Sequence, residues 1–277
     1  MREFLENRIA AAGLALLCLI VGVALLAPWI SPQNPYDLAA LNLLDARLPP
    51  GKEYLLGTDG QGRDMLSAIF YGLRVSLVVG VASGLIALTL GGLAGVLAAY
   101  VGGRFEQLLM RVVDIQLGFP AILVALILIA VMGKGVDKII IALVCVQWAY
   151  YARTARSAAL VERSKEYIEA ARGLGLSRAR VMLRHLLPNA LPPLIVVGTV
   201  QVAHAIALEA TLSFLGLGLP TTEPSLGLLI ANGYEYLLSG KYWISMYPGV
   251  ALLLTILSIN LVGDQLRDQF NPRLARA

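Results

Sequence analysis

The stretch VERSKEYIEAARGLGLSRARVMLRHLLPN at residues 161–189 differs sharply from the long apolar runs on either side of it. Eight of the 22 basic residues lie between positions 153 and 184: Arg153, Arg156, Arg163, Lys165, Arg172, Arg178, Arg180 and Arg184. Three acids there, Glu162, Glu166 and Glu169, leave a net charge of +5. Because Lys and Arg near span ends resist translocation, such an insert indicates a loop on the cytoplasmic side. We call residues 161–189 the basic loop.

Within the basic loop, the sequence predicts two short helices joined by a turn. Residues 161–172 are mostly good helix formers, and the following Gly173 and Gly175 suit a left-handed turn. Ser177 can cap a second helix through its hydroxyl. Pro188 predicts that this helix stops or kinks, because proline lacks a backbone N–H. A solvated loop that only connects two spans is the simpler alternative.

The composition places the chain among membrane proteins. Of its 277 residues, 58 % are hydrophobic and 14 % are charged, and the mean hydropathy is +0.74. Soluble domains carry about 25 % charged residues. Six apolar runs are candidates for spans of about 20 residues: 9–30, 75–101, 115–133, 139–152, 190–217 and 242–263. We therefore expect an all-α integral membrane protein with six transmembrane helices.

Three of these runs carry signals about helix geometry. Phe119-Pro120 predicts a kink in the third span. The fourth run has only 14 uncharged residues, so its helix should begin before Ile139 and continue beyond Arg153, whose long stem can reach the interface. In the second run, regularly spaced glycines predict a smooth face for close helix packing or, alternatively, a substrate path: Gly80, Gly84, Gly91 and Gly95.

The expected organisation is one membrane domain with polar segments on either side. Residues 1–30 are an N-terminal tail and the first transmembrane helix, and 31–73 are an extracytoplasmic loop. Residues 74–266 are a five-helix core that includes a cytoplasmic loop at 158–189, and 267–277 are a cytoplasmic tail. With both termini inside, 15 of the 22 basic residues lie on the cytoplasmic side, in agreement with the positive-inside rule.

Several kinds of site have no support in the sequence. Cys18 and Cys145 lie in apolar runs and are most simply small hydrophobic residues. His185 and His204 are the only histidines, and nothing resembles a metal cluster, so no metal site is expected. No phosphate-binding loop of the form GxxxxGK[ST] occurs, so we expect this chain not to bind ATP in that way.

Two polar features remain. Glu209 is the one acid deep in a span, where a carboxylate is costly. Three interpretations are open: its carboxylate contacts substrate in a transport path, it forms a hydrogen bond to a neighbouring helix, or it lies near the outer interface of the membrane. The segment LGTDGQGRD at 56–64 is either a structural turn with an Asp–Arg pair or a substrate contact. Residues 65–71 are expected to form a short helix on the membrane surface.

Motifs spread over most of the chain resemble one family. Glu169-Ala170-Ala171, followed by Gly175 and later by Leu187-Pro188, resembles the "EAA" loop of the membrane subunits of ABC importers. Other segments are similar to the dipeptide/oligopeptide/nickel subfamily: HLLPN at 185–189, LGTDGQGRD at 56–64, EATLSFLGLG at 209–218 and the closing segment at 260–273. The chain departs from the general pattern at His185, and from the subfamily at Leu226-Gly227, where Trp-Gly is usual.

The resemblance implies a C-type permease subunit with the type I ABC-importer permease fold. It assigns coupling to an ATPase to one stretch of the basic loop: Glu169, Ala170, Ala171, Arg172, Gly173, Leu174, Gly175, Leu176 and Ser177. The implied partners are a homologous second permease, two cytoplasmic ATPase subunits, an extracytoplasmic substrate-binding protein and the lipid bilayer. Nucleic acid is not among them.

The implied function is uptake of peptides, or of a related solute such as a nickel chelate, across a bacterial or archaeal cytoplasmic membrane. ATP and Mg²⁺ are expected on the partner subunits, with no cofactor on this chain, which is not itself an enzyme. Glu209 is a candidate for the substrate path. The rival interpretation is a transporter or channel that works without ATPases, its basic loop only setting topology. A membrane enzyme is a weaker rival, because no catalytic set of side chains is apparent.

Overall fold

The computed structural model describes residues 7–37, 42–220 and 222–270, and these contain helices and turns but no extended strand. The longer helices are α2 (Arg8–Ile30), α3 (Met65–Val101), α4 (Gly103–Leu117), α5 (Ala121–Met132), α6 (Val136–Arg163), α9 (Leu187–Phe214) and α11 (Trp243–Gln269). The shorter elements are η2 (Leu43–Asp45), α7 (Glu166–Gly173), α8 (Arg178–Arg180), η3 (Val181–Leu186), α10 (Leu226–Tyr234) and η4 (Leu237–Ser239).

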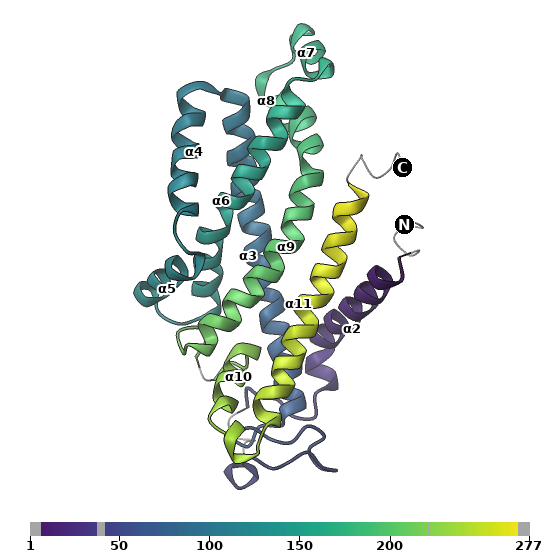
Figure 1. The fold of residues 1–277 in the computed structure, drawn as a ribbon, viewed down its shortest axis with the longest axis vertical. Helices are drawn as coiled ribbons and strands as arrows, with labels where there is room; N and C mark the ends of the chain where they lie inside the picture. Colours follow the sequence, from purple (N-terminus) through teal and green to yellow (C-terminus); the bar gives the residue numbers. More distant parts are fainter. Residues whose placement is uncertain (1–6, 38–41, 221, 271–277) are drawn as a thin grey trace.

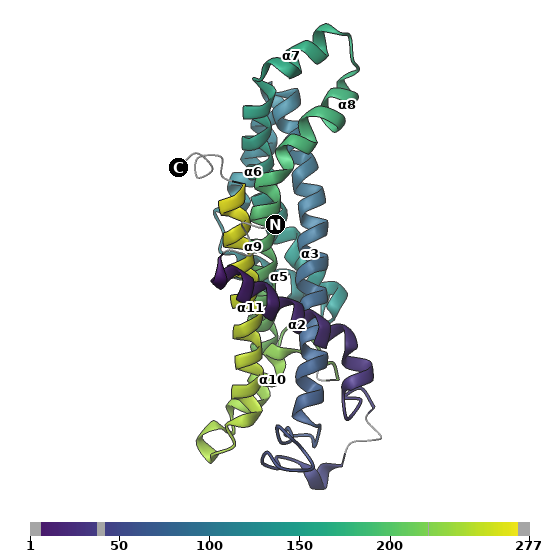
Figure 2. The same cartoon turned by 90° about the vertical axis from the view of Figure 1, so that its right-hand side faces the viewer.

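Three long helices, α3, α6 and α9, form the centre of the bundle (Figure 1). The helices α4 and α5 pack on the flank of α6, while α2 and α11 pack against each other and against α3 and α9. At one end of the molecule α10 packs on α9 and α11, and at the opposite end lie α7 and α8 (Figure 2). The basic loop and the outer turns therefore occupy opposite ends.

The described helices support a protein that crosses the membrane several times. Four of them are long and apolar enough to span a bilayer: α2, α3, α11, and α8 to α9 taken together as one 37-residue helix. If the bent pair α4–α5 counts as one span, the number is five. The predicted fourth span falls in α6, which begins before Ile139 and continues past Arg153 as predicted. The helix α6 is long enough to span a bilayer, but its uncharged part is short, so it is less apolar than the four candidate spans.

The start of α3 corrects one prediction. Residues 65–71 are not a separate surface helix; they are the first turns of a continuous 37-residue α3, which therefore begins inside the stretch predicted as loop. Asp64 caps this helix, since its Oδ2 accepts the backbone N–H of Ser67 at 2.8 Å. Arg74 is exposed, so its charge is solvated or reaches an interface without interrupting the helix.

The kink predicted at Phe119-Pro120 is confirmed as a much sharper break. The helices α4 and α5 meet at 89° across residues 118–120. Pro120 has no backbone donor and disfavours helical backbone at Phe119, so α4 ends and α5 starts anew. The helix that leads into the third predicted span begins at Gly103, ahead of the apolar run that starts at 115.

The helices of the basic loop are confirmed with different limits. The helix α6 continues into the loop as far as Arg163, and α7 starts at Glu166 rather than at residue 161. Ser177 caps α8, as predicted, by accepting the N–H of Arg180 at 3.4 Å. Of the predicted stop or kink at Pro188, the stop is wrong, because the helix runs from α8 through η3 into α9.

A widened turn explains how the helix passes Pro188. The six residues of η3 are π-helical, and the N–H of Leu187 bonds to the carbonyl of Met182, five residues back. A proline ring clashes with the carbonyl four residues earlier, here that of Arg184. The π turn encloses that position and relieves the clash without ending the helix.

The glycine face of α3 is packed closely, as the spacing predicted. A Cβ on Gly91 would overlap the carbonyl oxygen of Trp148, and one on Gly95 would overlap that of Ala152. Both carbonyls belong to α6. Glycine at these positions lets the backbones of α3 and α6 approach directly, which stabilises helix pairs in membranes through van der Waals packing.

The first and last described residues lie near each other. The Asn7 side-chain amide donates to Oε1 of Gln265 at 2.8 Å. Figure 1 shows the start of α2 and the end of α11 on the same flank of the molecule, well short of α7. The start of α2 therefore lies beside the end of α11.

Candidate functional site

The turn after α7 is built around Gly175. Its φ is +72°, in the left-handed region, as the sequence predicted. The N–H of Gly175 bonds to the carbonyl of Arg172 at 3.0 Å, and the N–H of Leu176 bonds to that of Ala171 at 3.3 Å. This pair of bonds is a Schellman motif, which satisfies the last carbonyls of a helix and reverses the chain.

One side of this turn is open to solvent. Leu174, at its apex, is 80 % exposed. Exposed residues cover most of the predicted coupling stretch: Glu169, Ala170, Arg172, Gly173, Gly175 and Ser177. A Cβ on Gly175 would meet no atom within 4 Å, so no residue that the structure describes covers this position. The surface is free to contact another protein.

The other side of the turn belongs to the core. Ile168 and Ala171 of α7, with Val181 and Leu186 of η3, are buried together with residues of α3, α6 and α9. Leu176 is partly buried against the same cluster. The turn is therefore not a loosely attached connection, because α7 packs on η3 and shares its buried core with the ends of the three central helices.

Bonds at the start of α7 hold it against α6. The Glu162 carboxylate accepts the Tyr167 hydroxyl at 2.8 Å and the Lys165 ammonium at 2.6 Å. Burial and the bond to Glu162 raise the pKa of Tyr167 to about 12, so the phenol stays protonated and remains a donor. These contacts fix the angle between the two helices.

At the opposite end, the 56–64 segment is a buried turn. The Arg63 Nε lies 2.9 Å from Oδ2 of Asp59, and both side chains are almost fully buried. The other oxygen of Asp59 accepts the backbone N–H groups of Gln61 and Arg63. Thr58 adds bonds to a neighbouring segment, to the N–H of Leu48 and the carbonyl of Asp45. These contacts are those of the structural turn that the sequence offered as one alternative.

Glu209 lies buried at the junction of three elements. Its carboxylate accepts the hydroxyl of Ser76 from α3 at 2.9 Å and that of Ser213 from α9 at 2.8 Å. The Ser225 side chain, which caps α10, is a third hydrogen-bonding partner. The carboxylate thus bonds to neighbouring elements, the second of the three alternatives, and no surface of it is exposed in this chain.

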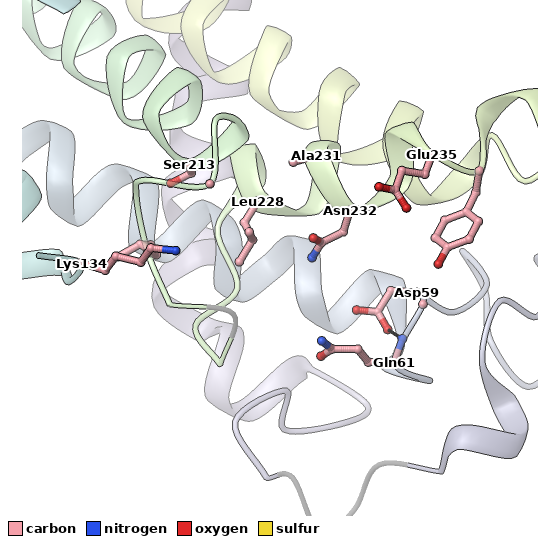
Figure 3. A pocket seen from close by; sticks show the side chains of 12 residues that line it. Asp59, Gln61, Lys134, Ser213, Leu228, Ala231, Asn232 and Glu235 are labelled. Atoms are coloured by element: carbon pink, nitrogen blue, oxygen red, sulfur yellow. Dashed lines mark hydrogen bonds between the residues drawn. The ribbon is translucent and has the colours of Figure 1, made fainter. Parts of the chain in front are cut away.

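A cavity of about 370 Å³ lies next to this junction (Figure 3). Its lining brings together the 56–64 segment, the α5–α6 turn, the end of α9 with the α9–α10 linker, and α10. Gln61 and Asn232 point into it from opposite walls, and Lys134 and Glu235 lie at its sides. Ser213 lines the cavity and bonds to Glu209, so Glu209 stands directly behind the wall.

Sequence reasoning missed most of this second site. The partners of Glu209 and the cavity residues are ordinary polar residues far apart in the chain: Ser76, Lys134, Ser225, Asn232 and Glu235. The one available signal was Ser225 before the apolar run of α10, which is a typical helix cap. Among the described residues, no three His, Cys, Asp or Glu side chains lie together as metal ligands would.

The Glu209 junction gives a direct test of its role. Glu209→Leu is expected to lower the free energy of unfolding by roughly 2 kcal/mol, because buried hydroxyl groups lose their acceptor. Glu209→Gln keeps an acceptor and should retain most of the stability. Thermal unfolding in detergent, followed by size-exclusion chromatography, measures both. Wild-type stability in both variants would contradict this structural role of the carboxylate.

Comparison with known proteins identifies the family. Residues 87–276 match the family described as binding-protein-dependent transport system inner membrane component. Residues 1–50 match the N-terminal TM domain of oligopeptide transport permease C. A chain in inward-facing structures of the MetNI methionine ABC transporter superposes with a TM-score of 0.62, at 21 % identity, over 75 % of this chain and 98 % of that one. This likeness confirms the expected type I permease fold.

Curated relatives match over nearly their whole length. A putative peptide transport system permease protein of Brucella abortus biovar 1 is 42 % identical, over 99 % of this chain and 90 % of that protein. The di/tripeptide transport system permease protein DppC of Pseudomonas aeruginosa is 38 % identical, over 100 % and 92 %. The oligopeptide transport system permease protein OppC of Bacillus subtilis is 36 % identical, over 100 % and 89 %. The chain therefore belongs to the family of binding-protein-dependent transport system inner membrane components and carries the N-terminal domain of its oligopeptide permease C branch.

Proposed function

We propose that this chain is the C-type permease subunit of an ATP-driven importer that takes up peptides, or a related small solute such as a nickel chelate. The named relatives, which are peptide, di/tripeptide and oligopeptide permeases, support a peptide substrate. An extracytoplasmic binding protein delivers the substrate, and the chain sits in a bacterial or archaeal cytoplasmic membrane with both termini inside.

The coupling element is the turn at residues 169–177. The observation that carries this proposal is its two-sided environment: Leu174 and Gly175 are exposed, while Ile168 and Ala171 beside them are buried in the core of α3, α6 and α9. An ATPase that pushes on the exposed side moves the three helices together. ATP and Mg²⁺ are bound by two cytoplasmic ATPase subunits, and a second, homologous permease completes the path. The chain itself has no enzymatic role.

The cavity beside Glu209 belongs to the outer part of the path. It lies at the end of the molecule opposite the basic loop, where a binding protein releases its substrate (Figure 1). Its amide and charged side chains suit the polar backbone and termini of a peptide. In this proposal Glu209 shapes the path by holding the cavity wall in place through Ser213, and direct contact with substrate requires the wall to open.

Membership in a family of binding-protein-dependent transport components favours this function over an ATPase-independent transporter or channel. The decisive experiment is uptake of a labelled tripeptide by proteoliposomes that contain the permease pair with and without the ATPases. We expect uptake only with the ATPases, the binding protein and ATP together. Equal uptake by the permease pair alone would establish the rival function.

The charge on the exposed face of α7 also matters for coupling. Glu169→Lys reverses a charge at an exposed position and should weaken association with the ATPases about tenfold, an effect of about 1.4 kcal/mol. Co-purification of the ATPases at matched membrane levels measures this effect. Glu166→Lys, on the first turn of the same helix and outside the coupling stretch, is the control with the same charge change. An equal effect in both variants would point to overall charge rather than to position 169.

The topology is open to cysteine labelling. After Cys18 and Cys145 are replaced by alanine, single cysteines at Glu53 and Ser239 should react with a membrane-impermeant maleimide added outside intact cells. A cysteine at Ser177 should react only after the cells are opened. All three positions are exposed, so accessibility within the fold does not limit the reaction. Outside labelling at Ser177 would reverse the proposed orientation.

A further inference from the structure

A second cavity, of about 420 Å³, lies between the end of α3 and the inner side of the basic loop. It is lined by Tyr100, Val101, Arg163, Arg172, Leu176 and Arg178. We propose that this cavity binds the phosphate headgroup of an anionic phospholipid, whose acyl chain lies along an exposed apolar stripe of α3. The proposal goes beyond the transport function and requires only that the chain is embedded in a membrane.

Two of the three arginines are turned toward α3. The Nη1 of Arg163 donates to the carbonyl oxygen of Ala99 at 2.6 Å. The guanidinium of Arg172 lies 5.5 Å from the centre of the Tyr100 ring, in cation–π geometry. Both groups therefore face the membrane helix rather than the exposed apex at Leu174. This direction favours a ligand from the bilayer over a partner protein that docks on the apex.

The charge of this cavity is not neutralised within the described residues. None of Arg163, Arg172 and Arg178 forms an ion pair there, whereas other basic residues of the same region do. Those paired residues are Arg153 with Asp114, Arg156 with Glu106, and Lys165 with Glu162. Guanidinium groups match the geometry of a phosphate and can bind it with two parallel hydrogen bonds.

The cavity continues into an apolar track on α3. Residues at spacings of three and four share one face of the helix and are 37–56 % exposed: Ile86, Leu90, Leu93, Leu97 and Val101. Val101 belongs to both the track and the cavity lining. Residues 75–101 are uncharged and cover roughly 40 Å at 1.5 Å per residue, about the thickness of a bilayer with its headgroup layers. The last turn of α3 therefore reaches headgroup depth, where Tyr100 is a typical interfacial residue.

The test measures lipid binding to the purified full-length chain by native mass spectrometry, with phosphatidylglycerol and phosphatidylcholine of the same acyl chains. Phosphatidylglycerol should bind more tightly, and added salt should reduce the difference. Arg172→Gln and Arg178→Gln should each lower its affinity roughly fivefold. Phosphatidylcholine binding should not change, which also shows that the variants are folded. Arg180→Gln, on α8 but outside the cavity, removes the same charge and should have no effect.

Further variants separate the two parts of the site. Arg172→Lys keeps the charge but loses the two parallel hydrogen bonds, so its affinity should lie between those of the wild type and Arg172→Gln. Leu93→Asn should weaken both lipids, because it changes the acyl track alone. Equal binding of the two lipids, or an equal loss in Arg180→Gln, would overturn the proposal. Glycerol phosphate that binds as tightly as the lipid would also overturn it, because the ligand would then be a soluble phosphate. Unchanged phosphatidylglycerol binding in Arg172→Gln, together with loss of ATPase co-purification, would assign the arginine to the ATPase contact instead.

Discussion

Gly175→Val is expected to reduce ATP-driven transport to less than a tenth of the wild-type rate while the chain still inserts into the membrane. Gly175 has a φ of +72°, and a β-branched residue there costs about 1–2 kcal/mol or more. Space is not the cause, since a Cβ at this position would touch nothing within 4 Å. The turn must therefore change shape, and with it the exposed surface around Leu174.

Gly175→Asn is the matched control, because asparagine tolerates the left-handed region. It should keep at least half of the transport and of the ATPase association. Co-purification of the ATPases and peptide uptake, both at equal membrane levels, are the two measurements. Normal association and uptake in Gly175→Val would show that this turn is not the coupling element.

Gly95→Leu is expected to prevent the chain from folding, so that every activity is lost together. The side chain would have to occupy the place of the Ala152 carbonyl on α6, and α3 and α6 would have to separate. Overpacking commonly costs 1–3 kcal/mol, and here the obstacle is backbone, which cannot rotate away. Fluorescence-detected size-exclusion chromatography should show aggregated or absent protein.

Gly249→Leu is the control for this variant. Gly249 lies inside α11 at a partly exposed position, and a Cβ there meets no atom within 4 Å, so the side chain starts in open space. Because leucine is also a better helix former than glycine, this variant should express as well as the wild type. A Gly95→Leu chain that elutes as a sharp native peak would mean that α3 and α6 are not packed through their backbones.

Local signals predicted much of the fold. The apolar runs predicted the long helices, of which four, or five with the bent pair α4–α5, are long and apolar enough to span a bilayer. The Phe119-Pro120 pair located the break after α4, and the glycine spacing located the face that α3 presents to α6. In the candidate site, Gly175 and Ser177 have the backbone roles that their residue types indicated. Each of these features depends on residues close together in the sequence.

The remaining features depend on contacts between distant residues. The angle of 89° after α4 cannot be read from a proline, which predicts a break but not its direction. Pro188 predicted a stop, whereas a π turn lets α9 continue, because packing of Val181 and Leu186 in the core favours an unbroken helix. The partners of Glu209 come from positions 76, 213 and 225, and no local pattern links them.

The unbroken length of α3 has a mechanical consequence. Its 37 residues extend about 55 Å, well beyond a hydrocarbon layer of about 30 Å. One end is fixed to the outer turn through the cap at Asp64, and the other packs against η3 in the basic loop. Because α3 is one continuous helix, a tilt at one of its ends is transmitted to the other. The outer turn and the basic loop therefore cannot move independently of each other through α3. Bending within the subunit is then expected at interruptions elsewhere in the chain, and the breaks after Leu117 and after Arg163 are candidate hinges.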